Sequence, residues 1–374
     1  MTPAPDAVVI GAGVVGAACA DALSAAGLRV TVCDAGFSGG GTTSAGMGHI
    51  VVMDDSPAEL ALSAWSRAKW AEWAPEMPAE CEDVRAGTMW IAADASEWPA
   101  LEEKQRAYAA AGVASEVLDA AALARAEPAL RAGLAGALRV PDDRVLYPPA
   151  AARWLLARAA ARGATVRERC AVRAIAPGEV TLDGERLACG AIVNAAGIDA
   201  PWLTPGLAVI PRKGHLLITE RHPGFCRHQL VELGYLTSAH TMTAASTAFN
   251  LQPRATGQVL IGSSRQLVGR DASLDRAMLA AMLERAIAFV PALATLTAVR
   301  AWTGFRPATP DKLPFIGAWP SVRGAWIAAG HEGLGITTAP ATAAILCALI
   351  TGAKPPIDAA PFSPARAMPA MEAA

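Results

Sequence analysis

The hydrophobic pattern near the start of the chain predicts a strand, a glycine turn, a helix and a second strand. A short apolar run, 7–10, precedes three closely spaced glycines, and an alanine-rich stretch with helical periodicity follows up to Ala26. A second apolar run, 28–33, ends at Asp34. This order is a βαβ unit, whose two strands lie parallel in one sheet.

The pattern along the rest of the chain alternates between βα units and strand-rich segments. Helices are expected over 57–73, 99–111, 149–162, 274–289 and 336–349. Strands are expected over 88–91, 134–147 with a turn at 141–142, 165–166 with a following hairpin, 191–197, 325–328 and most of 209–300. Segment 38–48 is expected to be a loop rich in glycine, serine and threonine, and 355–374 a frayed tail.

The composition fits a folded protein with a large core. Of the 374 residues, 53% are hydrophobic and 18% are charged, which excludes a disordered chain. Basic and acidic residues nearly balance, 32 against 34, so we expect neither nucleic acid nor an anionic membrane as a partner. The seven cysteines are scattered without a C-x-x-C pair, so we expect reduced thiols and no metal site.

Two apolar stretches are long enough to be considered as membrane-spanning segments. The first, 7–26, lacks a basic leader and is interrupted by glycines and an aspartate. The second, 333–353, carries no charge, but three threonines and a proline make its first half too polar for lipid. We therefore expect a buried core helix there, and a cytoplasmic protein that is at most peripheral at the inner membrane.

The first glycine turn carries a dinucleotide fingerprint. Gly11, Gly13 and Gly16 fit G-x-G-x-x-G between a strand and a helix. The first glycine makes the tight turn, the second lets a pyrophosphate approach the backbone, and the third allows close helix–strand packing. The helix N-terminus then offers N–H groups to the phosphates. Asp34, at the end of the second strand, suits a carboxylate that binds the ribose hydroxyls.

Two further segments bear on which nucleotide is bound, because the fingerprint alone fits both NAD and FAD. Segment 39–48 supplies small side chains, hydroxyls and a backbone that a long cofactor can approach closely. Segment 328–338 is a second strand-to-helix turn rich in glycine. A second helix N-terminus aimed at the cofactor would stabilise the negative charge of a reduced flavin, so the pair of segments favours FAD.

Several of these segments resemble the D-amino-acid oxidase family of flavoenzymes. The matching segments are 42–47, 194–197, 304–311, 314–317 and 330–331, and the resemblance runs in consistent order from about Val8 to Gly352. Glycine oxidase and the D-amino-acid dehydrogenases are the members most similar in these motifs. A more local resemblance, over 46–55, is to the flavoprotein subunits of hydroxyproline and opine dehydrogenases.

The resemblance implies an α/β fold with two interleaved domains. A doubly wound, Rossmann-like FAD-binding domain would comprise 1–80, 141–208 and 305–374. A mixed-sheet substrate-binding domain, inserted into the first, would comprise 81–140 and 209–304.

The resemblance also implies a set of FAD contacts. They are Gly11, Gly13, Val14, Val15, Gly16, Asp34, Ala35, Thr42, Thr43, Ser44, Gly46, Met47, Val172, Ala196, Gly197, Gly304, Gly330, Gly333, Leu334, Gly335, Ile336 and Thr337. Members with covalent flavin attach it through a cysteine in the segment before the Thr-Pro-Asp turn. Gly304 stands there in this chain, so we expect noncovalent FAD.

Arg306 is the strongest candidate for substrate binding. A guanidinium offers a planar pair of donors that match a carboxylate, a geometry that lysine lacks. Held in this way, the Cα–H of an amino acid would be oriented over the flavin. The family position agrees with this role. The alternative is a structural arginine paired with Asp311 or a backbone carbonyl.

Four other residues are weaker candidates for the catalytic site. Asn250 stands where glycine oxidase has a tyrosine that contacts the carboxylate. His331 and His49 either polarise substrate or flavin or are structural histidines. Arg265 either reaches the pocket or is exposed to solvent. Gly333 stands where glycine oxidase carries a second arginine, which argues against specificity for glycine.

The sequence therefore predicts FAD-dependent oxidation of the C–N bond of a small amino acid to an imine, by hydride transfer to flavin. The substrate would be a D-amino acid, or a cyclic or secondary amine such as D-hydroxyproline or D-proline. Oxygen, an electron-acceptor protein or a quinone would reoxidise the flavin, and a homo-oligomer is compatible with the sequence. Two alternatives stay open: a flavoprotein subunit of a heteromeric opine or hydroxyproline dehydrogenase, inactive alone, and a nicotinamide-dependent dehydrogenase.

Overall fold

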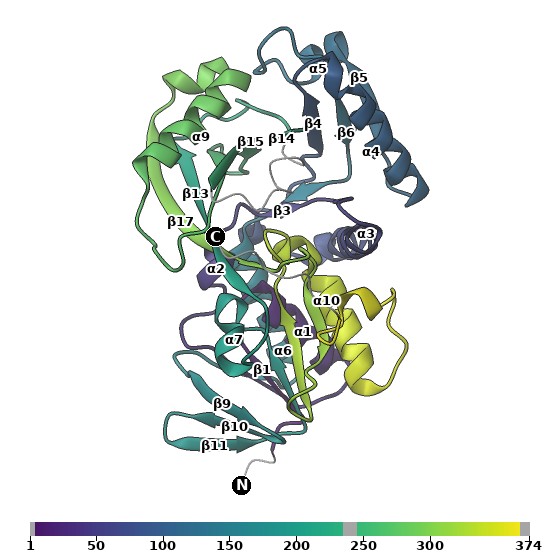
Figure 1. The fold of residues 1–374 in the computed structure, drawn as a ribbon, viewed down its shortest axis with the longest axis vertical. Coiled ribbons are helices and arrows are strands. Elements are labelled where there is room, and N and C mark those ends of the chain that lie inside the picture. The colour runs from purple at the N-terminus through teal and green to yellow at the C-terminus, as the bar shows by residue number, and fades with distance from the viewer. Residues whose placement is uncertain (1–3, 235–244, 367–374) are drawn as a thin grey trace.

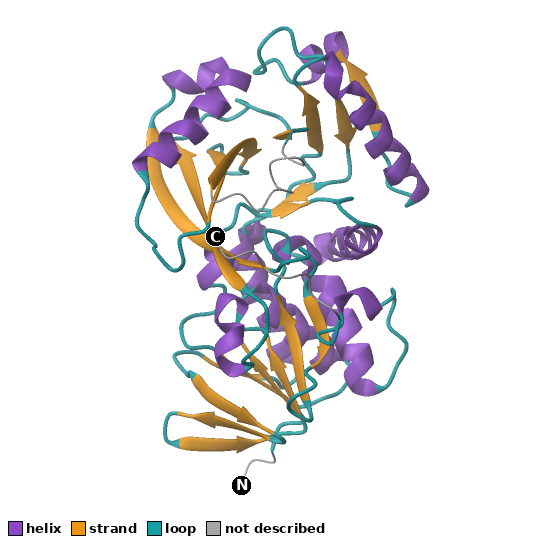
Figure 2. Cartoon of the chain, in the orientation of Figure 1, coloured by secondary structure: helices purple, strands orange, loops and turns teal. Residues whose placement is uncertain are grey.

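The computed structural model describes residues 4–234 and 245–366, and its two main sheets lie in opposite halves of the molecule (Figures 1 and 2). The first sheet has six strands in the order β18 (Phe315–Ala318), β19 (Ala325–Ala329), β12 (Ala191–Asn194), β1 (Ala7–Ile10), β2 (Val30–Cys33) and β8 (Thr165–Arg167). All neighbouring pairs are parallel except β18 and β19.

Alternate residues of this sheet are buried against two different layers. Ala7 and Val9 of β1 face a core formed with helices α1 (Val14–Ala25), α6 (Pro148–Ala161) and α10 (Gly335–Thr351). Val8 and Ile10 face the opposite side, as the twofold alternation of a strand requires. There a three-stranded sheet of β9 (Val172–Ala176), β10 (Glu179–Leu182) and β11 (Glu185–Ala188) covers the strands.

The second sheet has eight strands and is mostly antiparallel. Its order is β17 (Ala298–Ala308), β13 (Ile210–Thr219), β16 (Val259–Gln266), β15 (Ala245–Pro253), β14 (Gln229–Glu232), β4 (Thr88–Ala92), β6 (Gly136–Val140) and β5 (Glu116–Asp119). The pair β14 and β4 is parallel. Helix α9 (Arg276–Phe289) packs on β15 and β16, where the rings of Phe249 and Phe289 stack 4.6 Å apart.

The remaining elements connect the two sheets or flank them. They are α2 (Gly41–Ala45), β3 (His49–Ile50), α3 (Pro57–Trp73), α4 (Trp98–Ala110), α5 (Ala120–Ala126), β7 (Arg144–Val145) and α7 (Ala200–Leu203). Helix α3 begins at the expected residue because Ser56 caps it, with the hydroxyl accepting from Glu59 N at 3.1 Å. No helix among the described residues has the length and apolar character needed to cross a membrane.

Two local expectations were wrong. Segment 38–48 is not loop throughout, because Gly41–Ala45 form the short helix α2. The chain after Pro355 is not frayed up to 366: Phe362 is buried, and Arg366 forms an ion pair with Asp311 at 2.6 Å. Residues 367–374 of that tail lie outside the described residues.

The expected α/β class, with a Rossmann-like sheet and a second, mixed sheet, is confirmed. The proposed domain limits stay a prediction. The strands of the six-stranded sheet all fall inside the segments assigned to FAD binding, whereas β17 of the other sheet crosses the limit placed at 304/305.

Candidate active site

A cavity of about 1040 Å³ lies where the two sheets approach each other. Its lining comes from the carboxyl ends of β1, β2, β12 and β19 and from β13, β15, β16 and β17. Ligands of open parallel sheets bind at this end of the strands. The volume reaches the upper end of the range for small-molecule sites, about 300 to 1,000 Å³, so the cavity has room for an extended ligand.

Two helices begin at this cavity. Val14 and Val15 of α1 and Gly335 and Ile336 of α10 are part of its lining. Neither helix is capped by the side chain of its own N-cap residue. Two helix N-termini with their positive dipole ends at one cavity suit a ligand with more than one electron-rich group.

The start of helix α1 is bonded by a hydroxyl from the short helix α2. Thr43 Oγ1 accepts from the backbone N–H of Val14 at 3.0 Å. Asp34 accepts from Ala12 N at 2.6 Å and from Gly36 N at 2.7 Å, so each of its oxygens has one backbone partner and further acceptor capacity. Asp34 also lines the cavity, next to the glycine turn, in the position expected for ribose binding.

Glycine is required at two positions of the turn for different reasons. Gly11 has φ +106°, and a Cβ there would lie 2.5 Å from the carbonyl oxygen of Ala195. A Cβ on Gly16 would lie 2.0 Å from the carbonyl oxygen of Gly11. Gly11 and Gly13 line the cavity, whereas Gly16 does not and acts through helix–strand packing.

The segment 41–47 is tied to the eight-stranded sheet. Thr42 Oγ1 donates to Phe305 O at 2.7 Å, and Gln252 Nε2 donates to Met47 O at 3.0 Å. A Cβ on Gly304 would lie only 2.4 Å from the Cβ of Ala45. This close approach leaves no room for a cysteine side chain at position 304, which supports the expectation of a noncovalent cofactor.

Arg306 reaches across the sheet toward a carbonyl two strands away. It belongs to β17, and its guanidinium passes over Gly214 of β13 to donate from Nη1 to Ser264 O of β16 at 2.9 Å. A Cβ on Gly214 would lie 2.5 Å from that Nη1, whereas a Cβ on Gly333 would lie 3.4 Å from Nε. Of the two structural partners considered for Arg306, the structure shows the backbone carbonyl, whereas Asp311 forms its ion pair with Arg366.

His215 and Ser264, which lie beside Arg306, were not expected from the sequence. The Ser264 hydroxyl bonds both the backbone N and Nδ1 of His215, each at 2.9 Å. His215 lines the cavity but is fully buried within the protein fold. No local motif marks this histidine, because it lies in an ordinary strand pattern and meets Ser264 only through strand pairing.

The two histidines proposed for catalysis both line the cavity. His331 is 4% exposed and its Nε2 bonds Thr342 Oγ1 at 3.0 Å. Burial lowers the pKa of His331 and of His49 to about 3 in each case. Both imidazoles are therefore neutral near pH 7, and neither adds positive charge to the cavity wall.

Of the two remaining candidates, one lines the cavity. Asn250 of β15 is part of the lining. Arg265 is neither exposed nor part of the lining: it is 4% exposed, on the strand β16. The expectation that Arg265 either reaches the pocket or lies in solvent was therefore wrong. The register of β15 against β16 shifts between Thr247 and Asn250, so simple alternation along the strand does not predict where such a side chain points.

Most of the expected FAD contacts lie around this one cavity. Four do not line it: Gly16, Gly330, Leu334 and Thr337. Thr337 instead donates to His49 O at 2.9 Å and accepts from Val51 N at 3.2 Å, which fixes the start of α10. Among the described residues, the cysteine that lines the cavity is Cys33, and burial raises the pKa of its thiol to about 12.

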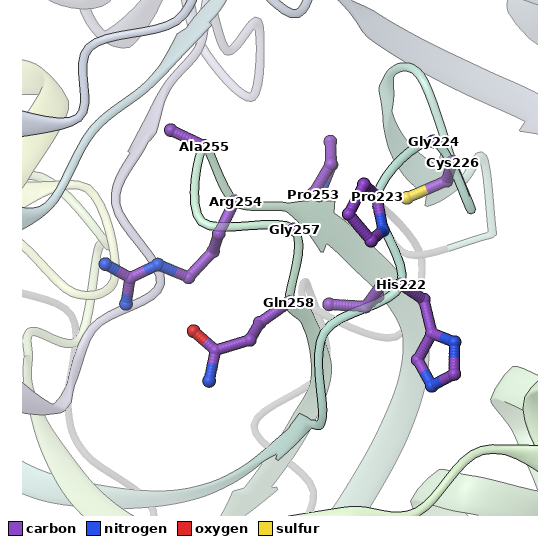
Figure 3. A pocket seen from close by; sticks show the side chains of 10 residues that line it. His222, Pro223, Gly224, Cys226, Pro253, Arg254, Ala255, Gly257 and Gln258 are labelled. Atoms are coloured by element: carbon purple, nitrogen blue, oxygen red, sulfur yellow. The ribbon is translucent and has the colours of Figure 1, made fainter.

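A second, smaller cavity of about 150 Å³ lies at the hairpin between β15 and β16 (Figure 3). Segments 222–226 and 253–259 line it. Cys226 is buried there, and burial raises the pKa of its thiol well above the ordinary value. This cavity has no helix N-terminus in its lining and is too small for a dinucleotide, so it is not the candidate active site.

The large cavity fits FAD in the chemistry of its walls. The glycine turn and Asp34 suit the ADP half, since they combine a close backbone approach with a carboxylate. The start of α10 suits the electron-rich end of a flavin. Beside this end stands Arg306, a cation suited to a carboxylate. The geometry therefore defines a flavin-dependent oxidoreductase.

Comparison with known proteins leads to the same class, a flavin-dependent oxidoreductase. The family model described as FAD dependent oxidoreductase matches residues 6–349, and the chain belongs to this family, with FAD as its cofactor. The expected membership of the D-amino-acid oxidase family is thereby confirmed.

Two relatives and one solved structure show what the chain is similar to. Glycine oxidase of Pseudomonas putida is 29% identical over 383 residues, which cover 96% of this chain and 97% of the relative. The hydrogen cyanide synthase subunit HcnC of Pseudomonas aeruginosa is 29% identical over 420 residues, covering 97% and 96%. The crystal structure of glycine oxidase from Geobacillus kaustophilus superimposes with a TM-score of 0.86 at 27% identity, covering 98% of this chain and 99% of that one.

Proposed function

We propose that this protein oxidises the C–N bond of a small amino acid, with Arg306 binding the substrate carboxylate. The observation that carries the proposal is the position of Arg306, whose guanidinium lines the cavity and is held by Ser264 O from one side. A guanidinium presents its N–H donors in a planar fork, a geometry that matches the two oxygens of a carboxylate. The resemblance to glycine oxidases over almost the whole chain supports the same reaction class.

The residues of the chain have binding and orienting roles in this reaction. When bound, FAD supplies the acceptor for two electrons and a hydrogen from the substrate Cα. Arg306 would fix the carboxylate, and with it the position of the Cα–H and the amine. The amine must be unprotonated to lose electrons, and the neutral imidazoles of His331 and His49 do not oppose the imine's developing positive charge.

The substrate we favour is a D-amino acid or a cyclic or secondary amine such as D-proline or D-hydroxyproline. Gly333 gives the cavity a small residue beside Arg306, in the position where glycine oxidase has its second arginine. Oxygen, a quinone or an acceptor protein would take the electrons. Location in the cytoplasm, at most peripheral at the inner membrane, belongs to the same proposal.

A second candidate is a flavoprotein subunit of a heteromeric dehydrogenase, inactive alone. The similarity to a subunit of hydrogen cyanide synthase favours it. Full turnover of the purified single chain with an artificial electron acceptor would argue against this candidate. Turnover that appears only when further subunits are added would argue for it.

The proposed function is tested by anaerobic titration of the holoenzyme, followed by the visible flavin band at about 450 nm. The panel comprises D-alanine, D-proline, 4-hydroxy-D-proline, sarcosine and glycine. Bleaching by at least one compound is expected. A flavin band that none of these compounds bleaches would contradict the proposal.

Variants then test the assigned role of Arg306. Arg306→Lys should lower kcat/KM by about 100-fold, since lysine lacks the paired donors, while FAD stays bound. Arg300→Lys is the matched control: Arg300 lines the same cavity but is exposed, with its guanidinium 5.6 Å from the Trp302 ring. It should change kcat/KM by less than about threefold. Equal effects of the two substitutions would count against the role given to Arg306.

A further inference from the structure

The bonds around His215 define its protonation state. The backbone N–H of Asp275 donates to His215 Nε2 at 3.1 Å. A backbone N–H is only a donor, so Nε2 must carry a lone pair and not a hydrogen. The hydrogen of the neutral ring is therefore on Nδ1, which donates to the hydroxyl of Ser264 at 2.9 Å. The structure thus selects one tautomer of a neutral imidazole.

The same bonds fix the orientation of Ser264. Its Oγ accepts from His215 Nδ1 and also from the backbone N of His215, at 2.9 Å in both cases. A hydroxyl oxygen has two lone pairs, and both are used. The side chain of Ser264 is therefore held at its strand β16, in the stretch where the register of β13 against β16 shifts between Lys213 and Leu217. At such a shift the backbone ladder is locally disrupted, and the bonds of Ser264 to His215 link the two strands there.

Ser264 in turn holds the candidate carboxylate-binding group. Its carbonyl oxygen accepts from Arg306 Nη1 at 2.9 Å. Arg306 comes from β17, and His215 comes from β13, which lies between β17 and β16. The absence of a side chain at Gly214 lets the guanidinium cross this middle strand. One chain of bonds thus runs from the imidazole through Ser264 to the guanidinium.

We infer that His215 is a positioning residue for substrate binding: its neutral, Nδ1-protonated ring holds Ser264, and Ser264 orients the guanidinium of Arg306 toward the substrate carboxylate. This inference rests on the proposed function, because it concerns the same carboxylate site. It assigns the ring a role in substrate affinity that acts through Ser264 and Arg306.

Burial and the positive charges around the ring favour the neutral form of His215. Burial lowers the pKa of His215, and the positive charges of Lys213 and Arg306 lower it further, whereas Asp275 and Asp271 act in the opposite direction. Protonation at acid pH would place a hydrogen on Nε2, facing the N–H of Asp275. That bond would then be lost, and the orientation of the carboxylate site with it.

The test compares wild type with His215→Asn and Ser264→Ala as holoenzymes. The first readout is the dissociation constant of acetate, a carboxylate that flavin does not oxidise, from its perturbation of the flavin spectrum. The second is kcat and KM for the best amino-acid substrate between pH 5 and pH 9. Both variants should weaken acetate binding and raise KM by about tenfold, which corresponds to the loss of one or two hydrogen bonds, with kcat within about threefold of wild type.

The pH dependence separates positioning from a general structural role. In wild type, the affinity for ionised acetate, corrected for the protonation of acetate itself, should fall toward acid pH as His215 takes up a proton. Asparagine does not titrate, so this acid limb should be absent in His215→Asn. The matched control is His222→Asn: His222 lies outside the large cavity, beside Glu220, and should leave both the affinity and the acid limb unchanged.

Two outcomes overturn the inference. One is acetate affinity in both variants equal to that of wild type at every pH. The other is a fall in kcat or in bound FAD while KM and acetate affinity stay the same, since that result indicates a structural role. Failure of the proposed function looks different: acetate binding would then be insensitive to Arg306→Lys, or no amino acid would reduce the flavin.

Discussion

The two ends of the large cavity are built from different parts of the polypeptide. At the end formed by the six-stranded sheet, backbone N–H groups, glycines and helix N-termini face the cavity. At the end formed by the eight-stranded sheet, side chains cross from strand to strand, as Arg306 and His215 do. The first end is thus specified by main-chain geometry and the second by side-chain contacts.

This difference is also one of sequence distance. Asp34 meets Ala12 across 22 positions within one βαβ unit. Arg306 meets Ser264 across 42 positions, and Ser264 meets His215 across 49. A motif can encode the first arrangement because a single turn contains it. The second depends on strand pairing, which no short motif encodes.

The largest effect is expected from a substitution in the glycine turn, at the end of the cavity formed by the six-stranded sheet. Gly16→Ala places a Cβ 2.0 Å from a backbone carbonyl oxygen, so helix α1 must shift, at a cost of about 3 kcal/mol. We expect loss of bound FAD together with a lower urea midpoint. The control is Gly27→Ala: Gly27 has φ +85° but open space around it, so the cost should be about 1 kcal/mol with FAD retained. FAD loss in both variants, or in neither, would contradict this explanation.

A smaller effect on stability is expected when the pH is lowered, because His331, the buried histidine before α10, is neutral in the folded protein. The pKa of His331 is about 3 in the folded protein, against an ordinary value of 6.5. Between these values the unfolded chain binds more protons, so stability falls as pH is lowered. From pH 6.5 to pH 5.0, His331 should contribute a loss of about 1.5 kcal/mol. His331→Gln should remove this part of the slope in urea unfolding at saturating FAD; parallel pH profiles would show that burial does not hold the ring neutral.

The end of the cavity formed by the eight-stranded sheet can be altered by substituting a glycine, without replacing a charged residue. Gly214→Ala places a Cβ 2.5 Å from Arg306 Nη1. The flexible guanidinium must therefore move away from its bond to Ser264 O. We expect KM to rise by about tenfold with little change in thermal stability. Gly333→Ala introduces only a contact of 3.4 Å and should raise KM by less than about threefold. The reverse order in steady-state kinetics would contradict the described path of the guanidinium.

The smallest effect is expected at the hydroxyl that holds the start of α1. Thr43→Val keeps the shape of the side chain but removes the acceptor for Val14 N, which should cost about 1 kcal/mol. Calorimetry of the FAD-free and FAD-bound protein measures the cost. Thr256→Val is the control, because its hydroxyl donates to the side chain of Gln258 in the turn between β15 and β16. A variant at 43 as stable as the control would indicate that the hydroxyl is dispensable.

The fold was largely predictable because its elements are long or bounded by clear signals. Helix α3 begins at Pro57, directly after its cap Ser56, and α1 ends at Ala25, two residues before Gly27, so residues typical of helix ends lie at both limits. The five-residue helix α2 is too short to show a periodicity. The tail was misjudged because Arg366 is ordered by Asp311, a partner 55 positions away that local composition does not reveal.

The candidate site was predictable to a different degree at its two ends. The glycine fingerprint located the FAD-binding end, and the family resemblance located Arg306, Asn250, His49 and His331, which all line the cavity. What the sequence did not reveal was how Arg306 is supported. Ser264 and His215 lie at shifts in strand register, where the alternation of exposed and buried residues is interrupted.

The hydrogen bond from Thr42 to Phe305 has a consequence for the order in which the protein is made. The two residues are 263 positions apart, so a chain emerging from the ribosome has synthesised the glycine turn long before the strand that closes the cavity exists. Contacts of such high sequence separation form late in folding because their loops are costly to close. The cavity is therefore completed only when nearly the whole chain is available, and cofactor capture then stabilises the contacts that form last.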